Sequence, residues 1–304
     1  GTISLDSKKN MNMFLDFYGQ DCNLINPFLN SISNTKGKIY GRANFYGPHD
    51  NYFIDGELSV KNLSFKIPYL NTSYYLKDNY NIFCKKDQIS LDTVKFYDKK
   101  HNTNGKFSGK AVHSNALKKM SYDIFISSNN LYCLNTKIDH NDVYYGDVFA
   151  AGDILIHGQP DNVYFNINAE SKKGTKFNIP LSSATEISNE NHLEIFNSSD
   201  IISSNQIEKE KIVNQKNDFK MDFNLDLRSN AQVQIIYDEK IGDIIKGSGK
   251  GDLKLEIDES GNFNMYGEVL VKEGEYLYTM QNLFNKNFKI ENGGSLYWDG
   301  DPYN

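Results

Sequence analysis

The feature that most constrains how this chain can fold is an alternation of apolar and polar residues that recurs along nearly its whole length. In residues 252–258, Leu253, Leu255 and Ile257 occupy every second position, and every position between them carries a charged side chain. Successive side chains of a β-strand point to opposite faces of the sheet. The alternation therefore predicts a strand with one buried face and one solvated face.

The same alternation predicts strands throughout the rest of the chain. Besides 252–258, the predicted strands are residues 38–46, 53–60, 63–67, 89–96, 107–112, 122–127, 148–156, 164–170, 220–227, 233–237 and 263–271. Gly and Asn adopt the positive φ of tight hairpins, so their positions predict turns. The predicted turns are Asp55-Gly56, Asn104-Gly105, Ser260-Gly261 and residues 158–161. We predict an all-β chain, a long antiparallel meander of about 15 to 18 strands.

Sequence that favours helices is scarce. Residues 203–215 follow a Ser-rich run, and their composition fits either a short helix or a disordered insertion. We therefore expect a β part at residues 1–197, a charged inserted loop or short helix at 198–217, and a C-terminal part of the same β domain at 218–304.

A single meander of this size cannot remain flat. Strands lie about 4.8 Å apart, so fifteen or more of them would span on the order of 70 Å. Such a sheet must curl or close, since no amphipathic helices are available to cover its apolar face. A barrel, a sandwich and a U-shaped trough all satisfy this requirement. The trough would leave an apolar groove open along its length, which suits a hydrocarbon ligand.

The charges argue against nucleic acid as a partner. Lys and Arg total 33 against 39 Asp and Glu, which gives a net charge of −6, and only Arg42 and Arg228 are arginines. Phosphate backbones are bound by clustered cations, above all by the bidentate guanidinium group. No run of eighteen apolar residues is present, so no segment of this chain is predicted to span a membrane. We expect the chain to be a fragment of a longer protein.

No arrangement of residues predicts catalysis, a metal site or a cofactor. The histidines are scattered without metal-ligand spacing, and we expect them at the surface or at strand ends; they are His49, His101, His113, His140, His157 and His192. Residues 139–142 lack the alternating ligands of a calcium loop, so a polar hairpin tip is expected there. Residues 247–251 resemble a phosphate loop but are followed by a strand rather than a helix.

The cysteines and aromatic pairs each have a structural interpretation. Cys22, Cys84 and Cys133 are widely spaced, which predicts small buried hydrophobic residues with at most one disulfide. Tyr74-Tyr75, Tyr144-Tyr145 and residues 276–278 could form stacking platforms for sugars or bases. Aromatic residues are favoured on strands in any case, so ordinary sheet packing is the preferred interpretation.

The last eighty or so residues resemble a known family. The stretches that carry the resemblance are residues 231–247, 251–253, 263–267, 273–279 and 288–304, and upstream 67–72 and 177–183. They are similar to the C-terminal domain of the TamB family of translocation and assembly module proteins, in the form found in Bacteroidota. This family belongs to the AsmA-like superfamily of bridge-like lipid transfer proteins.

The resemblance implies a non-enzymatic envelope protein without cofactors. It implies a trough of the β-taco type that crosses the periplasm, with an inner-membrane anchor upstream of this chain. The expected function is phospholipid passage between the inner and outer membranes in support of outer-membrane assembly, with a TamA-like outer-membrane β-barrel as partner. The alternative is a chaperone that presents strand edges to outer-membrane β-barrel proteins during insertion or secretion. A third hypothesis, a surface adhesin that contacts sugars through tyrosines, is disfavoured by the closing motif.

The expected sites follow from these two hypotheses. The inward-facing residues expected to line a lipid groove are Phe165, Ile167, Met221, Phe223, Leu225, Leu227, Leu253, Leu255, Ile257, Phe263, Met265, Val269 and Val271. The residues expected at a partner-binding edge are Phe288, Ile290, Leu296 and Trp298. No catalytic residue and no metal ligand is expected.

Overall fold

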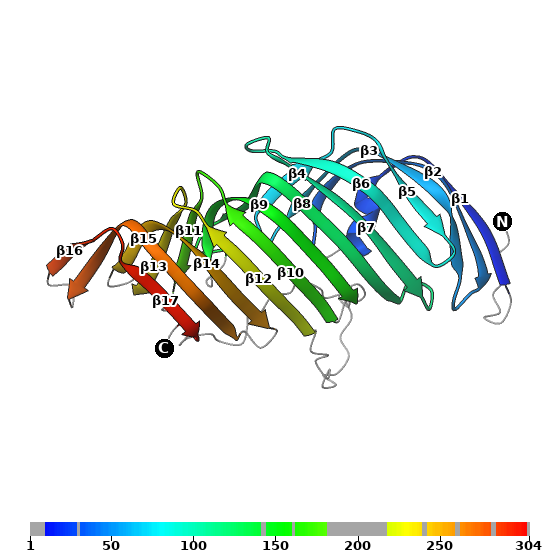
Figure 1. Cartoon of the computed structure of the whole chain (residues 1–304). Coiled ribbons are helices and arrows are strands. Elements are labelled where there is room, and N and C mark those ends of the chain that lie inside the picture. Colours follow the sequence, from blue (N-terminus) through cyan, green and yellow to red (C-terminus); the bar gives the residue numbers. More distant parts are fainter. Residues whose placement is uncertain are drawn as a thin grey trace, which may run out of the picture.

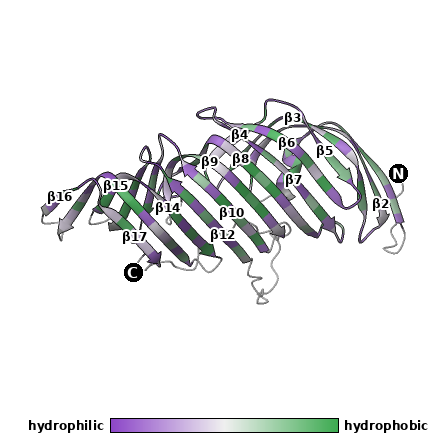
Figure 2. Ribbon diagram, viewed as in Figure 1, coloured by the Kyte–Doolittle hydropathy of each residue, from purple (hydrophilic) through white to green (hydrophobic). Residues whose placement is uncertain are grey.

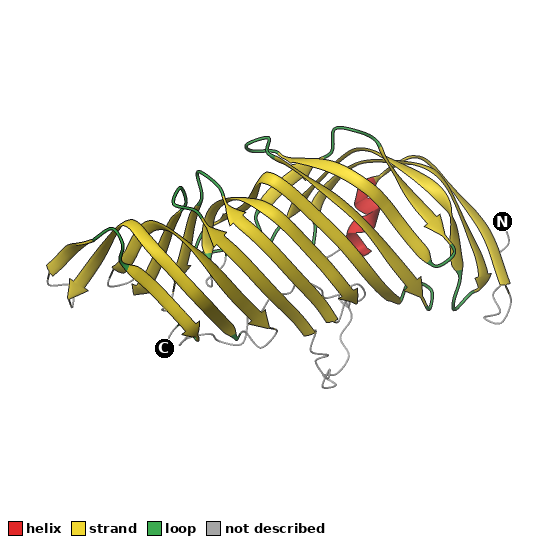
Figure 3. Cartoon of the chain, viewed as in Figure 1, coloured by secondary structure: helices red, strands yellow, loops and turns green. Residues whose placement is uncertain are grey.

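A computed structural model describes residues 10–28, 31–140, 144–159, 162–180, 218–238, 242–258, 262–280 and 284–302. These residues form one sheet of 17 strands and one short 3-10 helix, Cys22–Phe28 (Figure 3). The strands are β1 (Asn10–Asp21), β2 (Ser33–Pro48), β3 (Phe53–Ile67), β4 (Thr72–Tyr75), β5 (Tyr80–Lys85), β6 (Gln88–Asp98), β7 (Asn104–Ser114), β8 (Lys119–Thr136), β9 (Tyr145–Gln159), β10 (Asn162–Ser171), β11 (Lys176–Pro180), β12 (Asp218–Leu227), β13 (Gln232–Asp238), β14 (Asp243–Asp258), β15 (Phe263–Met280), β16 (Phe284–Ile290) and β17 (Ser295–Gly300). The predicted all-β meander is confirmed.

The sheet is curled along its length. Figure 1 shows a front wall and a back wall that join along a ridge, with β1 at one end and β16 and β17 at the other. Long strands such as β8, β9, β14 and β15 pass from one wall to the other. Elsewhere two short strands share the place of one long strand: β3 pairs with both β4 and β5, and β15 pairs with both β16 and β17.

Irregular pairing marks the bend between the walls. The β14–β15 register shifts between Ser248 and Gly249, and the β8–β9 register shifts between Ser128 and Leu131. A bulge inserts an extra residue on one strand and bends it, so long strands can follow the ridge without losing their pairing on either side.

Two strand pairs depart from the antiparallel meander. Strand β10 runs parallel to β12, and β11 runs parallel to β13. Two parallel neighbours cannot be joined by a hairpin and need a long return connection. Residues 181–217 provide that connection in sequence, and the predicted helix or insertion at 203–215 lies there, outside the described residues.

Two predicted turns are wrong. Gly56 lies inside β3, and Gly105 lies inside β7. A Cβ atom at Gly56 would meet the carbonyl oxygen of Arg42 at 2.3 Å, and one at Gly105 would meet the ring of Phe96 at 2.7 Å. These glycines therefore allow close approach across the sheet and do not make turns. Of the predicted turn at residues 158–161, Gly158 and Gln159 belong to β9, which pairs with β10 from Gln159 and Asn162 onward. Residues 160 and 161 and the predicted turn Ser260-Gly261 lie outside the described residues.

The core lies on the inward face. Figure 2 shows hydrophobic and hydrophilic positions alternating along the strands. Three buried clusters follow one another along the trough. The first is centred on Cys22, Ile39 and Val60, and the second on Tyr74, Val94 and Phe96. The third is centred on Leu227, Leu253 and Met265. The first cluster includes Cys22 of the 3-10 helix, and the other two are built mainly from neighbouring strands, so the sheet covers most of its own apolar face.

A seam of side-chain hydrogen bonds joins β8 to the hairpin of β3 and β4. Asn71 donates to the carbonyl of Asn135 at 2.7 Å, and the side chain of Asn135 donates back to the carbonyl of Asn71 at 3.3 Å. The Tyr74 hydroxyl donates to the carbonyl of Tyr132 at 3.1 Å. Beyond Asn130, β8 no longer pairs with β7 and pairs with β9 alone among the described strands, and these side-chain bonds satisfy backbone groups that β7 does not reach.

The turn between β6 and β7 is built around one carboxylate. Asp98 is 1% exposed and accepts hydrogen bonds from the backbone N–H groups of Lys100, His101 and Thr103. It also accepts the hydroxyl proton of Thr103, whose oxygen in turn accepts from the N–H of Tyr132. Asp98 therefore connects the turn to the bend of β8.

We predict that Asp98→Asn lowers the free energy of unfolding by about 2 kcal/mol, because an amide NH₂ group would face donors that need an acceptor. Asp92→Asn on the same strand is the matched control, since Asp92 is exposed and the charge change is identical. Chemical denaturation followed by circular dichroism measures both. Equal unfolding midpoints for the two variants would show that the Asp98 network does not stabilise the fold.

Candidate functional site: the apolar interior and the terminal strand edge

An unbroken row of apolar side chains crosses eight strands on the inward face. Its members lie directly opposite one another in the strand registers. In order from β6 to β15, this upper inner row consists of Val94, Phe107, Ile126, Ile154, Ile167, Phe223, Leu255 and Met265. Neighbouring strands lie about 4.8 Å apart, so the row extends for roughly 34 Å along the trough.

A second row lies two residues farther from the ridge. This lower inner row crosses β8 to β15 and consists of Ile124, Ile156, Phe165, Met221, Ile257 and Phe263. All six side chains are only partly buried. On β10 the next inward residue farther from the ridge, Val163, is 1% exposed, so partly buried and fully buried apolar side chains alternate toward the rim.

The residues predicted to line a groove all lie on the inward faces of β10, β12, β14 and β15. Leu227, Leu253, Met265 and Val271 are buried, and the other nine are partly buried. The buried ones lie close to the ridge or under Trp298, which packs against the Leu227 cluster. These residues therefore share one face of the sheet, and the register shows which of them are neighbours.

The interior is filled by side chains where the two walls meet. A cavity of about 60 Å³ lies between Ile235, Ile245, Leu253, Val271 and Trp298. This space would hold a few water molecules at most.

His113 is a polar exception on the inward face. It is 2% exposed, its ring centroid lies 6.5 Å from that of Tyr52, and neither ring nitrogen makes a well-formed hydrogen bond with a described residue. Burial lowers the pKa of His113, although the nearby charge of Asp87 acts in the opposite direction. His113 is the last residue but one of β7, which agrees with the expected strand-end position. It is not at the surface, because it has the same inward position as Ala111 in the alternation of β7.

The terminal edge is formed by β16 and β17. Both pair with β15 alone among the described strands, so each has one open side. Phe288 is 42% exposed, whereas Ile290, Leu296 and Trp298 are partly buried and line the interior cavity. The four predicted edge residues thus divide into one exposed residue and three that anchor the two strands on the inward face.

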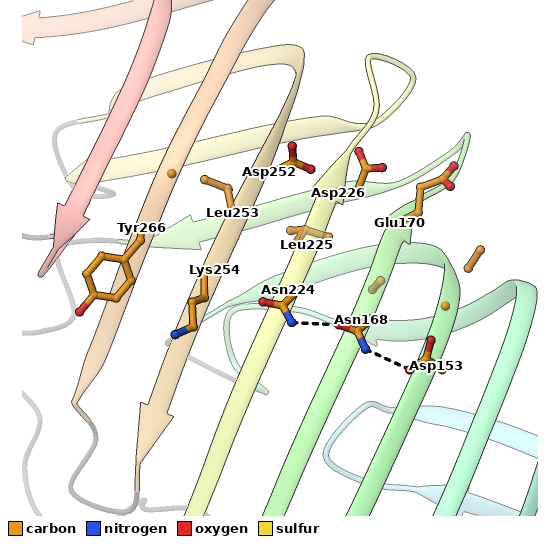
Figure 4. A pocket seen from close by; sticks show the side chains of 14 residues that line it. Asp153, Asn168, Glu170, Asn224, Leu225, Asp226, Asp252, Leu253, Lys254 and Tyr266 are labelled. Atoms are coloured by element: carbon orange, nitrogen blue, oxygen red, sulfur yellow. Dashed lines mark hydrogen bonds between the residues drawn. The ribbon is translucent and has the colours of Figure 1, made fainter.

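The outer face carries polar rows instead. An open hollow of about 620 Å³ crosses β9, β10, β12, β14 and β15 (Figure 4). Along it, Asn224 donates to Asn168 at 2.9 Å and Asn168 donates to Asp153 at 3.1 Å. These bonds tie three strands together. They do not place a nucleophile beside a base, and no group of three metal-ligating side chains occurs among the described residues.

The three cysteines do not pair. Cys22 is buried, Cys84 and Cys133 are partly buried, and all three are free thiols. Burial raises the pKa of the Cys133 thiol to about 12, so its thiolate is disfavoured. They behave as the small apolar residues that their spacing predicts.

The family model of the TamB C-terminal domain matches residues 92–304. The chain belongs to the TamB family. The match begins within β6 and includes both inner rows and the terminal edge. TamB proteins are envelope proteins and non-enzymatic components of the translocation and assembly module, in which TamA is the associated partner. No curated protein and no solved structure matches this chain. No helix among the described residues is long and apolar enough to cross a bilayer.

We predict that His113→Phe reduces the loss of stability on acidification. The folded-state pKa of His113 lies below its unfolded value, so its contribution is present above about pH 6.5 and is lost as the pH falls. Wild type should lose about 1 kcal/mol more unfolding free energy than the variant between pH 7 and pH 5. Denaturant titrations at the two pH values measure this difference.

The exposed His49 provides the control. A His49→Phe variant should keep the wild-type pH dependence. If His113→Phe also keeps it, the buried imidazole is not the group whose protonation opposes folding.

Proposed function

We propose that the two inner rows hold the acyl chains of phospholipids during passage between the inner and outer membranes. The observation that carries this proposal is the lower inner row, six apolar side chains that are aligned across strands and remain partly uncovered. The full protein would be held in the inner membrane by an upstream segment and would cross the periplasm. Within it, residues 218–304 would form the C-terminal part of the same β domain as residues 1–197.

The energetics favour such a ligand. Each CH₂ group removed from water contributes about 0.8 kcal/mol, so an acyl chain lying along the rows gains stability in proportion to its length. The charged headgroup can remain outside the open rim and keep its hydration. Transfer of this kind requires no catalytic group, which is consistent with a non-enzymatic family.

Phe223→Asp and Asn224→Asp test the proposal as a matched pair. The two residues are adjacent on β12, point to opposite faces, and each variant adds one negative charge. We expect phospholipid to co-purify with wild type and Asn224→Asp and to fall by roughly fivefold or more in Phe223→Asp, because a carboxylate on the apolar face must be desolvated beside the acyl chain. Mass spectrometry of lipids extracted from protein purified from a bacterial envelope measures this.

Circular dichroism shows whether the variants are folded. Ile257→Asp, nearer the rim, is a milder variant of the same kind and should also lose lipid. Equal lipid in Phe223→Asp and Asn224→Asp, or no lipid in wild type, would overturn the interior as a lipid site.

The open sides of β16 and β17 favour a second candidate function, strand addition to an outer-membrane protein. Unpaired N–H and C=O groups on an edge strand can template another strand. The exposed Phe288 and Tyr297 would supply side-chain contacts there. A TamA-like outer-membrane β-barrel is the expected partner.

We predict that removal of residues 284–302 abolishes binding to a TamA-like partner while the co-purifying lipid remains, because the inner rows lie upstream of this segment. Pull-down with the purified partner and lipid mass spectrometry on the same sample separate the two functions. Retained partner binding would exclude this edge, and simultaneous loss of lipid would show that the deletion disrupts the trough.

A further inference from the structure

The outer faces of β4 and β6 place two tyrosines between lysines. Tyr75 and Tyr97 lie directly opposite each other in the register. Lys95 lies two residues before Tyr97 on β6, and Lys99 lies two residues after it, in the turn that follows the strand. Lys77 lies two residues after Tyr75, in the bend that follows β4. The Lys99 N–H donates to the carbonyl of Ser73, which continues the alignment past the end of β6.

The two rings form a supported pair. Their centroids are 5.6 Å apart with an interplanar angle of 30°, and the Tyr75 hydroxyl donates to Asn102 at 2.8 Å. The Nζ atoms of Lys77 and Lys95 lie 3.8 Å and 5.2 Å from the centroid of the same Tyr97 ring. Two ammonium groups are therefore held beside one ring by cation–π contacts.

Further lysines extend this cluster on the neighbouring strands. Lys106 on β7 lies directly opposite Lys95, and Lys66 on β3 lies directly opposite Ser73. None of these five lysines forms an ion pair within the described part of the chain, whereas Lys110, nearby on β7, pairs with Asp123. Like charges opposite each other on a sheet are destabilising. In a chain with a net charge of −6, this local excess of positive charge is unbalanced.

We propose that this surface, the lysine–tyrosine platform of Lys66, Tyr75, Lys77, Lys95, Tyr97, Lys99 and Lys106, binds a linear acidic glycan. The tyrosine row would support the sugar rings, since a tyrosine has an apolar body and a polar tip. Lys77, Lys95 and Lys106 lie on one side of that row, and Lys66 and Lys99 lie on the other. Four residues of strand separate the two sides, so a chain with anionic groups on both edges fits a width of about 13 Å.

The geometry favours a chain over the other anionic partners. The rows run across the strands, along the length of the trough, so an extended polymer can contact several lysines in succession. The outer face near the ridge is convex in Figure 1, which limits its contact with a flat bilayer. A nucleic acid would be expected to require arginine forks, and the platform contains none. This site lies outside the apolar interior, so its test is independent of lipid binding.

Binding of the intact chain to polygalacturonate, a linear carboxylated glycan, tests the proposal, with uncharged dextran as the blank. Lys77→Gln/Lys95→Gln/Lys106→Gln should weaken binding on the order of tenfold in about 0.05 M salt, and wild-type binding should weaken at about 0.5 M salt. The control is Lys85→Gln/Lys119→Gln/Lys250→Gln, which changes the net charge equally at exposed lysines elsewhere. It should bind within about twofold of wild type.

The Tyr97→Leu variant distinguishes binding at the platform from non-specific attraction between charges. It preserves every lysine and removes the ring that positions two of them, so we expect a loss of about threefold. Circular dichroism checks the fold of each variant. Equal loss in the two triple variants, or no loss in Tyr97→Leu, would overturn the site.

Two other occupants would also overturn the proposal. Tighter binding to phosphatidylglycerol vesicles than to polygalacturonate would identify a membrane surface as the partner. Salt-sensitive self-association in sedimentation experiments, abolished by the platform triple variant, would identify a second copy of the chain. In that case the acidic row on the outer face, Glu170, Asp226, Asp252 and Glu268, would be the complementary surface.

Discussion

The structure depends on the burial of one apolar sheet face without a second layer to cover it. Every strand contributes apolar side chains to the inward face at period two, and the described residues include only one short helix. Curling brings two walls of the same sheet together, and the Leu227, Leu253 and Met265 cluster is the result. The six side chains of the lower inner row remain only partly buried. The partly covered inner rows therefore result from the burial of the apolar face by curling of the sheet alone.

The bend imposes a cost in backbone hydrogen bonds, and polar side chains offset it. Where β6 and β7 turn back, the neighbouring stretch of β8 loses a strand partner. Asn71 and Tyr74 supply donors to its carbonyls, and the Thr103 hydroxyl accepts from the N–H of Tyr132. Asp98 in turn orders the segment that carries Thr103. Buried polar groups thus occur mainly where regular pairing stops, and the remainder of the inward face can stay apolar.

The alternation of residues such as Leu253, Leu255 and Ile257 predicted strand type and inward face, because both depend on local sequence. Registers between distant strands depend on contacts that no single segment encodes, and so the upper inner row could not be derived from periodicity. Gly56 shows the limit of local signals: the same absence of a Cβ atom that favours a turn also permits close approach across a sheet. The parallel β10–β12 pair and the burial of His113 were likewise outside local prediction. The sequence alone shows Tyr75 and Tyr97 only as distant residues of the chain, and the register shows that they lie opposite each other.

The inner rows are apolar from strand to strand, whereas the outer face changes in charge along the trough. Along the lower inner row, each step from one strand to the next exchanges one aliphatic or aromatic side chain for another, with no hydrogen-bonding group in the row. A hydrocarbon chain held there would gain a similar free energy at each step, because burial of apolar area is non-directional. Movement along the trough would then encounter only low barriers. The outer face changes in charge from the lysines of β6 and β7 to the carboxylates of β12, β14 and β15, so a charged ligand there would be held in one place. A uniform apolar face suits translation, and a patterned polar face suits anchoring.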